Sequence, residues 1–395
     1  MVSMSRKHGV GFWVVAYAFA VTMAFSAAPA PLYVLYQQKD GFGPFTVTLV
    51  FAIYAVGVMV SLVLAGHVSD WVGRRRVLVP AVLVNVLAAV MFLAWTSVPA
   101  LLVARFVSGI SIGMLTATAT AHLTELHAVA RPDAPRTRAD VVATAANLGG
   151  LGLGPLIAGL LAQYVADPLH VPYLVFQALM LVGALAVALV PETVEAVSRP
   201  YRPQRISVPA DARGRFFAAG AAALAGFAVL GLFTSLAPGF LADTLHQHSH
   251  ALAGVVAFAV FGSAAVSQIL LARTRLRRQV GLGLGLLVTG IVLVIVAVWV
   301  PSLALFLVGG VLAGAGTGSA FKGCVSIVLS IAPPERRGET LAGLFLAAYI
   351  GLTVPVLGLG LAAQFVAIEV ALLGFGALLL AVLALVARPL VAAAV

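Results

Sequence analysis

One short charged segment, residues 66–76, stands between two long apolar ones. It has the pattern Gly-x-x-x-Asp-x-x-Gly-Arg-Arg-Arg, with glycines at Gly66 and Gly73 and the acid at Asp70. Glycines allow a tight turn and a close approach between backbones, so we expect a short connection between two helices here. A carboxylate is stabilised at a helix N-terminus, where the helix dipole favours negative charge. The spacing therefore predicts that Asp70 docks on a helix elsewhere in the chain.

The arginines of the same segment offer guanidinium groups to acids on neighbouring helices. Glu125, near the end of a later apolar segment, is the expected partner of Arg74. The alternative is an ordinary basic turn with a solvated acid, which explains the arginines but not the spacing of the glycines and the acid. We expect a latch that holds two parts of the protein in one arrangement and comprises Gly66, Asp70, Gly73, Arg74, Arg75 and Glu125.

Two more charges lie inside apolar segments. Arg105 stands about six residues into its segment, which is about 9 Å along a helix, and a charge at that depth in a membrane costs on the order of 3 kcal/mol. Lys322 is the only lysine within such a segment. Both are candidates for proton coupling or substrate binding, and the alternative for each is a side chain that extends to the membrane interface. Since both deep charges are positive, the sequence indicates a neutral or anionic substrate.

A glycine-rich stretch at 150–159 predicts close helix packing. Small residues let two helices approach closely, and a proline inside a helix kinks it. The residues concerned are Gly150, Gly154, Pro155 and Gly159. Polar and aromatic side chains in other apolar segments are candidates for the wall of a cavity, although hydrogen bonding between helices is the alternative. These possible wall residues are Tyr33, Tyr54, Asn147, Gln177 and Gln268.

The elements that must position these residues follow from the composition. The chain has 395 residues, of which 62% are hydrophobic and 9% charged, whereas soluble domains carry roughly a quarter charged residues. Backbone groups in lipid must be paired internally, and runs of about 20 apolar residues suit helices rather than barrel strands. The sequence therefore predicts an all-α membrane protein with twelve spans, at about 10–36, 45–65, 77–97, 100–123, 140–164, 171–191, 215–238, 250–272, 280–299, 302–330, 340–363 and 368–387.

The basic residues predict the orientation of these spans. All but three of the 23 lysines and arginines fall in alternate connections or at the termini; the exceptions are Lys39, Arg105 and Lys322. Basic residues favour the cytoplasmic side, so we expect both termini in the cytoplasm and the protein in a bacterial plasma membrane. The turn at 192–214 is long, polar and proline-marked, and it predicts a linker between an N-terminal bundle, 1–191, and a C-terminal bundle, 215–395.

The two predicted bundles look like copies of one another. Gly109 and Gly113 match Gly310 and Gly314 at one offset, and a second match follows at nearly the same offset in a later span. Internal repeats of this kind are typical of transporters that bind their substrate between two related halves. The sequence thus predicts two pseudo-symmetric six-helix bundles.

Composition and motifs also argue against other classes of protein. The net charge of +10 comes from short turns rather than from one domain face, so no nucleic acid is expected as a partner. One cysteine, Cys324, is too few for a disulfide framework or a cysteine metal site. A nucleotide-binding P-loop is absent, and no metal or other cofactor is expected. The expected partners are a small-molecule substrate and the lipid bilayer, with the monomer as the functional unit.

Twelve spans, two related halves and the 66–76 pattern resemble the major facilitator superfamily over essentially the whole chain. The signature turn of that family matches at Gly66, Asp70, Gly73, Arg74 and Arg75, and departs from the family at Val68 and Trp71.

Two further stretches resemble motifs of the same family. Arg105, with a glycine four residues later, resembles an arginine that the family links to proton movement. The 150–159 stretch is similar to a motif of exporters, although one family glycine is Ala158 here. Pro191-Glu192-Thr193 also looks like the family.

The resemblance implies a secondary active transporter that works by alternating access. We expect a proton-coupled exporter of a small molecule, with the proton gradient as its energy source. An uptake symporter or facilitator with the same fold is the first alternative. A membrane receptor or enzyme without transport is the second, although the spans hold no paired carboxylates, Ser/His/Asp set or metal cluster that supports catalysis.

Overall fold

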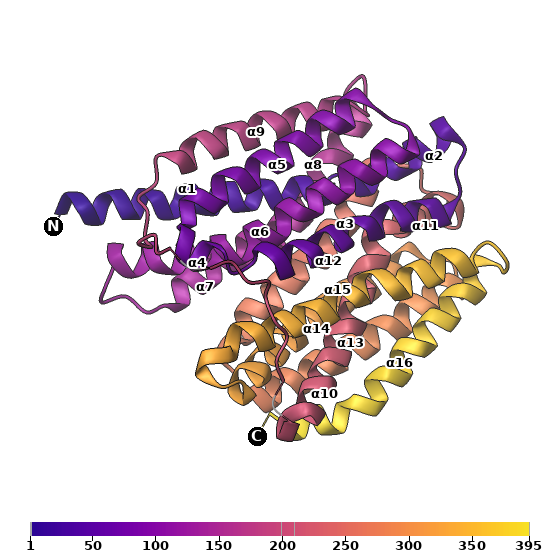
Figure 1. The fold of residues 1–395 in the computed structure, drawn as a ribbon. Coiled ribbons are helices and arrows are strands. Elements are labelled where there is room, and N and C mark those ends of the chain that lie inside the picture. The colour runs from indigo at the N-terminus through magenta and orange to yellow at the C-terminus, as the bar shows by residue number, and fades with distance from the viewer. Residues whose placement is uncertain (1, 199, 209, 395) are drawn as a thin grey trace.

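A computed structural model of the chain describes residues 2–198, 200–208 and 210–394, and every regular element in these ranges is a helix. Twelve of the helical segments are long and apolar enough to cross a membrane. The predicted fold class, an all-α membrane protein with twelve spans, is thereby confirmed. Figure 1 shows the helices side by side in two groups, the earlier part of the chain in one and the later part in the other.

The first group contains six spans. They are built from α1 (Val2–Ala27) with α2 (Tyr33–Asp40), α3 (Pro44–Ala65), α5 (Arg74–Ala94), α6 (Val98–Ala130), α7 (Thr137–Thr144) with α8 (Gly150–Tyr164), and α9 (Val171–Ala188). A single helical turn, α4 (Ser69–Val72), lies between α3 and α5.

The second group repeats this arrangement after the linker. Its spans are α10 (Arg213–Ser235), α12 (His250–Leu270), α13 (Leu276–Trp299), α14 (Leu303–Ile331), α15 (Arg337–Ala362) and α16 (Ile368–Ala392). A short helix, α11 (Ala237–Asp243), follows α10 on the same side of the molecule as α2.

Two spans expected to be continuous are interrupted. The first breaks after α1, where Pro29 and Pro31 remove backbone donors, and a 3-10 turn at Ala30–Leu32 leads into α2. The fifth contains a π-helical turn, Ala145–Gly149, between α7 and α8. Such turns often mark functional sites because they redirect side chains, and this one carries Asn147.

The two groups contact each other through two helix pairs. In the first group α6 packs against α1, α3 and α5; in the second, α14 packs against α10, α12 and α13. Between the groups, α8 packs along α12 and α3 packs along α15. The second and fifth spans of one group thus meet the fifth and second of the other, which is the pairing that a pseudo-twofold axis requires.

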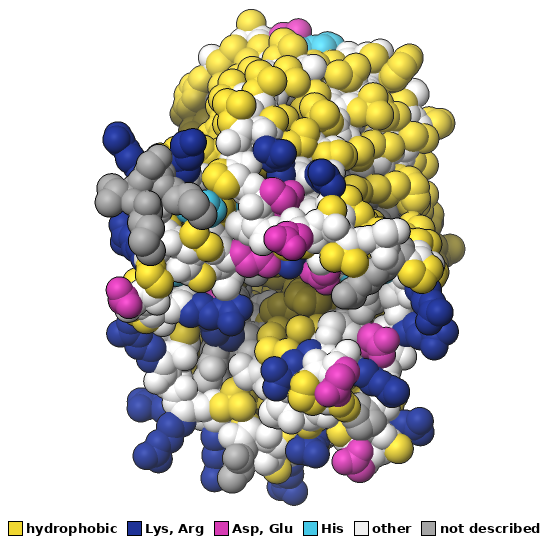
Figure 2. All heavy atoms as spheres, turned by 60° about the vertical axis from the view of Figure 1, so that its left-hand side comes forward, with side chains coloured by type: hydrophobic (Ala, Val, Ile, Leu, Met, Phe, Trp, Pro, Cys, Tyr) yellow, Lys and Arg dark blue, Asp and Glu magenta, His cyan; other side chains and the backbone are white. Residues whose placement is uncertain are grey.

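The arginines gather at one end of the molecule. We call this the basic end, defined by Arg74 to Arg76, Arg273 to Arg278, and Arg336 with Arg337. Helices α5, α13 and α15 all begin there. Figure 2 looks onto this part of the surface, where basic and acidic side chains lie around a hollow between the two groups. The other end, where α8 ends and α12 begins, is called the opposite end.

The linker runs across the basic end from one group to the other. Val197 donates its backbone N–H to the carbonyl of Trp71 at 3.0 Å, and Gln204 donates to the carbonyl of Val63 at 2.8 Å. Farther along, the Thr340 hydroxyl at the start of α15 donates to the carbonyl of Ser207 at 2.9 Å. The linker is therefore attached to both groups.

Candidate functional site

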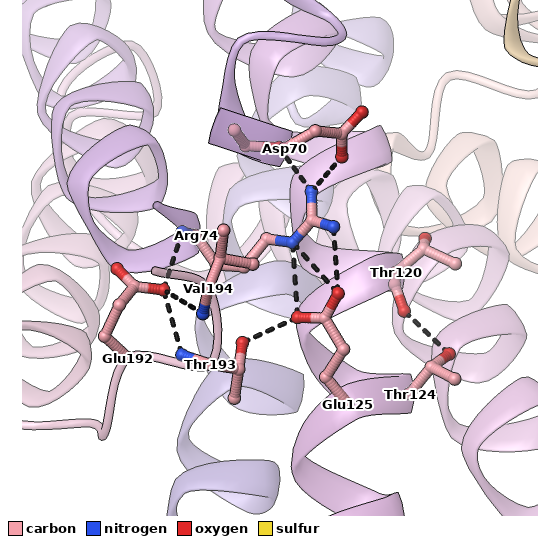
Figure 3. A network of polar contacts seen from close by, with 9 residues as sticks. Asp70, Arg74, Thr120, Thr124, Glu125, Glu192, Thr193 and Val194 are labelled. Atoms are coloured by element: carbon pink, nitrogen blue, oxygen red, sulfur yellow. Dashed lines mark hydrogen bonds and ion pairs between the residues drawn. The ribbon is translucent and has the colours of Figure 1, made fainter. Parts of the chain in front are cut away.

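Arg74 is the centre of a polar network at the basic end (Figure 3). Its Nη2 lies 2.8 Å from Oε1 of Glu125, and its Nε donates to the same carboxylate at 3.2 Å. Its Nη1 donates to Asp70 at 2.5 Å and to the Ser69 hydroxyl at 2.8 Å. Such a fork on a carboxylate fixes orientation as well as charge pairing. The structure thus pairs Arg74 with Glu125, as the sequence suggested, and adds Asp70 as a second acid on the same guanidinium.

A second acid, Glu192, holds the start of α5 from the linker side. Its carboxylate accepts the backbone N–H groups of Arg74 at 2.8 Å and Arg75 at 3.0 Å. These are unpaired donors of a helix N-terminus, where negative charge is favoured. The neighbouring Thr193 donates to Glu125 at 2.6 Å. The end of the sixth span is therefore joined to the charged turn.

The backbone conformation requires a glycine at only one of the two glycine positions in this turn. Gly73 has φ +118°, and a side chain there would also meet the carboxylate of Glu192. Gly66 has φ −58°, an ordinary helical value. The expected need for glycine freedom therefore applies to Gly73 and not to Gly66.

Asp70 is not docked on a distant helix N-terminus in this conformation, although the spacing predicted that contact. Its side chain is 63% exposed, and among the described residues it makes no hydrogen bond or ion pair to the second group. The network around Arg74 lies wholly within the first group and its linker. In this conformation the surface between the two groups is hollowed at the basic end (Figure 2), and the described contacts of the Asp70 side chain stay within the first group. Docking in another conformation stays a prediction.

A cavity of about 480 Å³ lies between the two groups. It extends from Tyr33 to Asp140, in the first turn of α7, and to Leu329, near the last turn of α14. The cavity thus reaches toward the basic end, where the surface is hollowed (Figure 2). Its size suits a small organic molecule. Both groups contribute to its wall.

Arg105 lies in the wall of this cavity and is 2% exposed. Its Nη1 donates to the carbonyl of Ser26 at 2.5 Å, whereas its buried Nε finds no partner among the described residues. Its guanidinium carbon lies 4.4 Å from the ring centroid of Tyr54 and 5.9 Å from that of Phe51. The guanidinium is thus held by aromatic rings and one carbonyl rather than by an acid.

Lys322 lines the cavity from α14, in the second group. Its side chain is half-buried, and its ammonium group makes no hydrogen bond or ion pair to any described residue. Asp140 also lines the cavity, and its side chain is exposed.

Four of the five possible wall residues line the cavity, namely Tyr33, Tyr54, Asn147 and Gln268. Gln268 points toward the other group, with its amide 3.5 Å from the Thr144 hydroxyl. The prediction that Gln177 lines the cavity is wrong. It is half-buried on α9, a helix that packs against α5 and α1 at the periphery, and it is not part of the cavity wall.

The glycine-rich stretch faces two neighbours. A side chain at Gly150 or Gly154 would meet the carbonyls of Ala20 and Ala24 on α1, whereas one at Gly159 would meet the carbonyl of His250 on α12. The interior proline, Pro155, lies between them, with its own carbonyl against Gly254 of α12. The stretch therefore packs α8 on both groups.

These contacts close the opposite end of the cavity. Gln163, at the end of α8, accepts the backbone N–H of His250 at 2.9 Å. On the other side of the interface, a side chain at Gly360 of α15 would meet Thr48 of α3. Helices from the two groups are in backbone contact here, while at the basic end the surface between them is hollowed (Figure 2).

Sequence reasoning missed the role of Glu192 and Thr193. Their motif was visible directly after the sixth span, but its partner, the start of α5, lies more than a hundred residues earlier. No periodicity connects the two, so only the fold reveals that they meet.

Comparisons with known proteins agree with this architecture. The family model described as Major Facilitator Superfamily matches residues 12–246. Arabinose-proton symporter of Bacillus subtilis (strain 168) is 29% identical over 133 residues, covering 31% of this chain and 28% of that protein. Multidrug resistance protein MdtM of Salmonella typhimurium is 32% identical over 177 residues, covering 44% of this chain and 41% of that protein. The chain thus spans less than half the length of either relative.

Solved structures share the fold over nearly the whole length. The human organic anion transporter MFSD10 (TETRAN) has a TM-score of 0.69 at 18% identity and covers 97% of this chain and 99% of its own. The nucleoside transporter NupG has a TM-score of 0.71 at 12% identity and covers 96% and 99%. At such identities the likeness concerns the fold. Family and neighbours are transporters rather than enzymes, and with twelve spans and a cavity between two helix groups, this chain belongs to the major facilitator superfamily of membrane transporters.

Proposed function

We propose that the protein is a proton-coupled exporter that moves a small molecule across a bacterial plasma membrane by alternating access. The observation that carries this proposal is the cavity between the two helix groups, which reaches toward the basic end while backbone contacts close the opposite end. A substrate would enter at the basic end, and the groups would then rock about the cavity to open the other end. The two bundles, 1–191 and 215–395, are the proposed moving bodies.

The direction of transport depends on which end faces the cytoplasm. Arginines favour the cytoplasmic side, so we place the basic end and both termini there. The cavity would then load from inside the cell. The stretch at 150–159, which resembles an exporter motif, and the similarity to Multidrug resistance protein MdtM both support export.

The energy source in this proposal is the proton gradient, with no bound cofactor. Arg105 is the proposed coupling residue, because its buried Nε in the cavity wall has no acceptor among the described residues and can donate to a substrate or to a proton-carrying group there. Binding of a proton or substrate would shift the balance between the two conformations by its differential affinity for them. The proposed working unit is the monomer, because the cavity lies within one chain.

A second candidate function is uptake by symport with the same fold. The similarity to the arabinose-proton symporter favours it, although that match covers a smaller part of the chain. In symport, substrate and proton would cross in the same direction.

The test is transport by the purified full-length protein in proteoliposomes. A thermal-shift screen over antibiotics, dyes, sugars and organic anions selects the compounds to be used. A pH gradient is then imposed, and compound and proton movements are recorded together, the latter with a trapped pH-sensitive dye. We expect each compound to move uphill against an opposite flow of protons, and collapse of the gradient by an ionophore to abolish uphill movement.

Two results would contradict the antiport proposal. Uphill movement in the same direction as protons would establish symport, and equal rates with and without the gradient would establish a facilitator. Lys39→Gln serves as the control variant, because Lys39 bonds Thr96 at the opposite end, outside the cavity.

A further inference from the structure

The cavity wall carries an excess of positive charge. Arg105 in the first group and Lys322 in the second both line it, and among the described residues no carboxylate lies within ion-pair distance of either. The one acid in the described wall is Asp140, which is exposed at the first turn of α7. Charges in a low-dielectric site are costly unless they are paired. The wall therefore lacks an anion that would offset its two cations.

Arg105 has hydrogen-bonding capacity to spare. A guanidinium has five N–H donors, and the structure uses one, at the carbonyl of Ser26. The buried Nε remains without an acceptor. Leaving a buried donor unpaired is unfavourable, and an acid group in the cavity would supply acceptors.

Lys322 stands beside a group of aromatic rings on the second half of the wall. The ring centroids of Phe227 and Phe321 are 4.9 Å apart, and Phe321 lies 5.7 Å from Phe345. Tyr349 is 6.0 Å from Phe227. All four rings line the cavity. An aromatic ligand would find faces and edges to stack on here.

We propose that the cavity binds aromatic organic anions, with the acid group paired to its cations and the apolar body packed on the rings of α10, α14 and α15. This assignment rests on the proposed transport function, since it names the class of molecule carried. A cationic drug would instead meet two like charges, and its only acid partner in the described wall would be an exposed one. A neutral sugar would offer hydroxyl acceptors but no anionic group to pair with either cation.

The test compares three ligands that differ only in charge: naphthoate, the neutral naphthamide and the cation naphthylmethylammonium. Binding to the purified full-length protein in detergent is measured by isothermal titration calorimetry. We expect naphthoate to bind at least about tenfold more tightly than either analogue, because a charge-assisted hydrogen bond is worth that much or more.

Lys322 supplies the matched variants, since its ammonium group has no partner in the described part of the chain whose loss would disturb folding. Lys322→Gln should weaken naphthoate about tenfold and leave naphthamide unchanged, whereas Lys322→Arg should keep the preference. Arg105→Lys, which keeps the charge, provides a second variant, and Lys39→Gln is the control outside the cavity.

Three outcomes would overturn the inference. They are equal or tighter binding of the cation, an anion preference that survives Lys322→Gln in full, and failure of naphthoate to bind at millimolar concentration. Because binding is measured without a membrane or a gradient, the result is independent of the transport proposal. An anion preference without gradient-driven flux in proteoliposomes would reject the antiport mechanism while leaving the ligand class intact.

Discussion

At the scale of single residues, one charged pair was predictable from the spacing of the charged residues in the sequence. The pattern indicated that Arg74 pairs with an acid, and Glu125 lay at the matching end of a helix, whereas the ion pair of Arg74 with Asp70 was not predicted. The roles of Glu192 and Ser26 were not predictable, because each acts through a contact set by tertiary packing: the carboxylate on the start of α5, and the carbonyl that accepts from Arg105. Neither contact leaves a periodic signal in the sequence.

Two substitutions separate stability from switching in the Arg74 network. The Arg74 side chain is 10% exposed, so Glu125→Gln would leave a nearly buried guanidinium short of its charged partner. We expect a loss of about 2 kcal/mol, seen as a lower Tm in detergent. Asp70→Asn removes a mostly exposed acid, so we expect a change below about 1 kcal/mol but a marked fall in transport rate, because the docked conformation would lose its anion.

The readouts for these variants are thermal unfolding and flux in proteoliposomes, measured on the same preparations. A wild-type transport rate in Asp70→Asn would remove the docking role of that acid. An unchanged Tm in Glu125→Gln would show that the network does not stabilise the first group.

At the scale of elements, the long spans were predictable because about 20 apolar residues leave the backbone no alternative to a helix in lipid. The irregular turns within the first and fifth spans were harder to predict. Proline marked the break after α1, but nothing in the local sequence distinguishes the π-helical turn at Ala145–Gly149 from regular helix. The placement of Gln177 was wrong for a related reason: polarity alone does not reveal which face of a helix meets the cavity.

Close packing where α8 crosses α12 can be tested with one variant and one control, both on α12. A side chain at Gly254 would collide with the carbonyl of Pro155, whereas nothing lies within 4 Å of the position for Gly262. Gly254→Ala should separate the two helices, lower the Tm and slow transport. Gly262→Ala should be neutral or stabilise the protein by up to about 1 kcal/mol, because alanine favours helix. Equal Tm values for the two variants would refute close packing at this crossing.

At the scale of the whole molecule, composition and internal repeats led to the family and its architecture. Which end of the molecule is open could not be predicted from the sequence. In the proposed transport cycle the same chain closes either end, so one sequence would encode both arrangements. The backbone contacts at the opposite end and the exposed Asp70 at the basic end identify the one described here.

A cross-link tests whether this conformation is one step of a cycle. Cys324 is the only cysteine and is buried, so Cys324→Ala provides a background without thiols. In it, Gln163→Cys and His250→Cys together are bridged by a short bis-methanethiosulfonate, which forms a disulfide with each thiol and releases methanesulfinate. The bridge should hold the opposite end closed and stop transport until a reductant cleaves the two disulfides. Each single variant, treated alike, should remain active. Continued transport by the bridged protein would exclude alternating access through this end.

The path of the linker sets a limit on how wide the basic end can open. Gln204 is bonded to the end of α3 and Ser207 to the start of α15, and three residues of extended chain span at most about 11 Å. While those bonds hold, the corner between α3 and α15 behaves as a short-tethered hinge, and a bulky molecule would have to pass on the far side, past α7 and α14. The entrance is thereby asymmetric, even though the two bundles that form it are built as near copies.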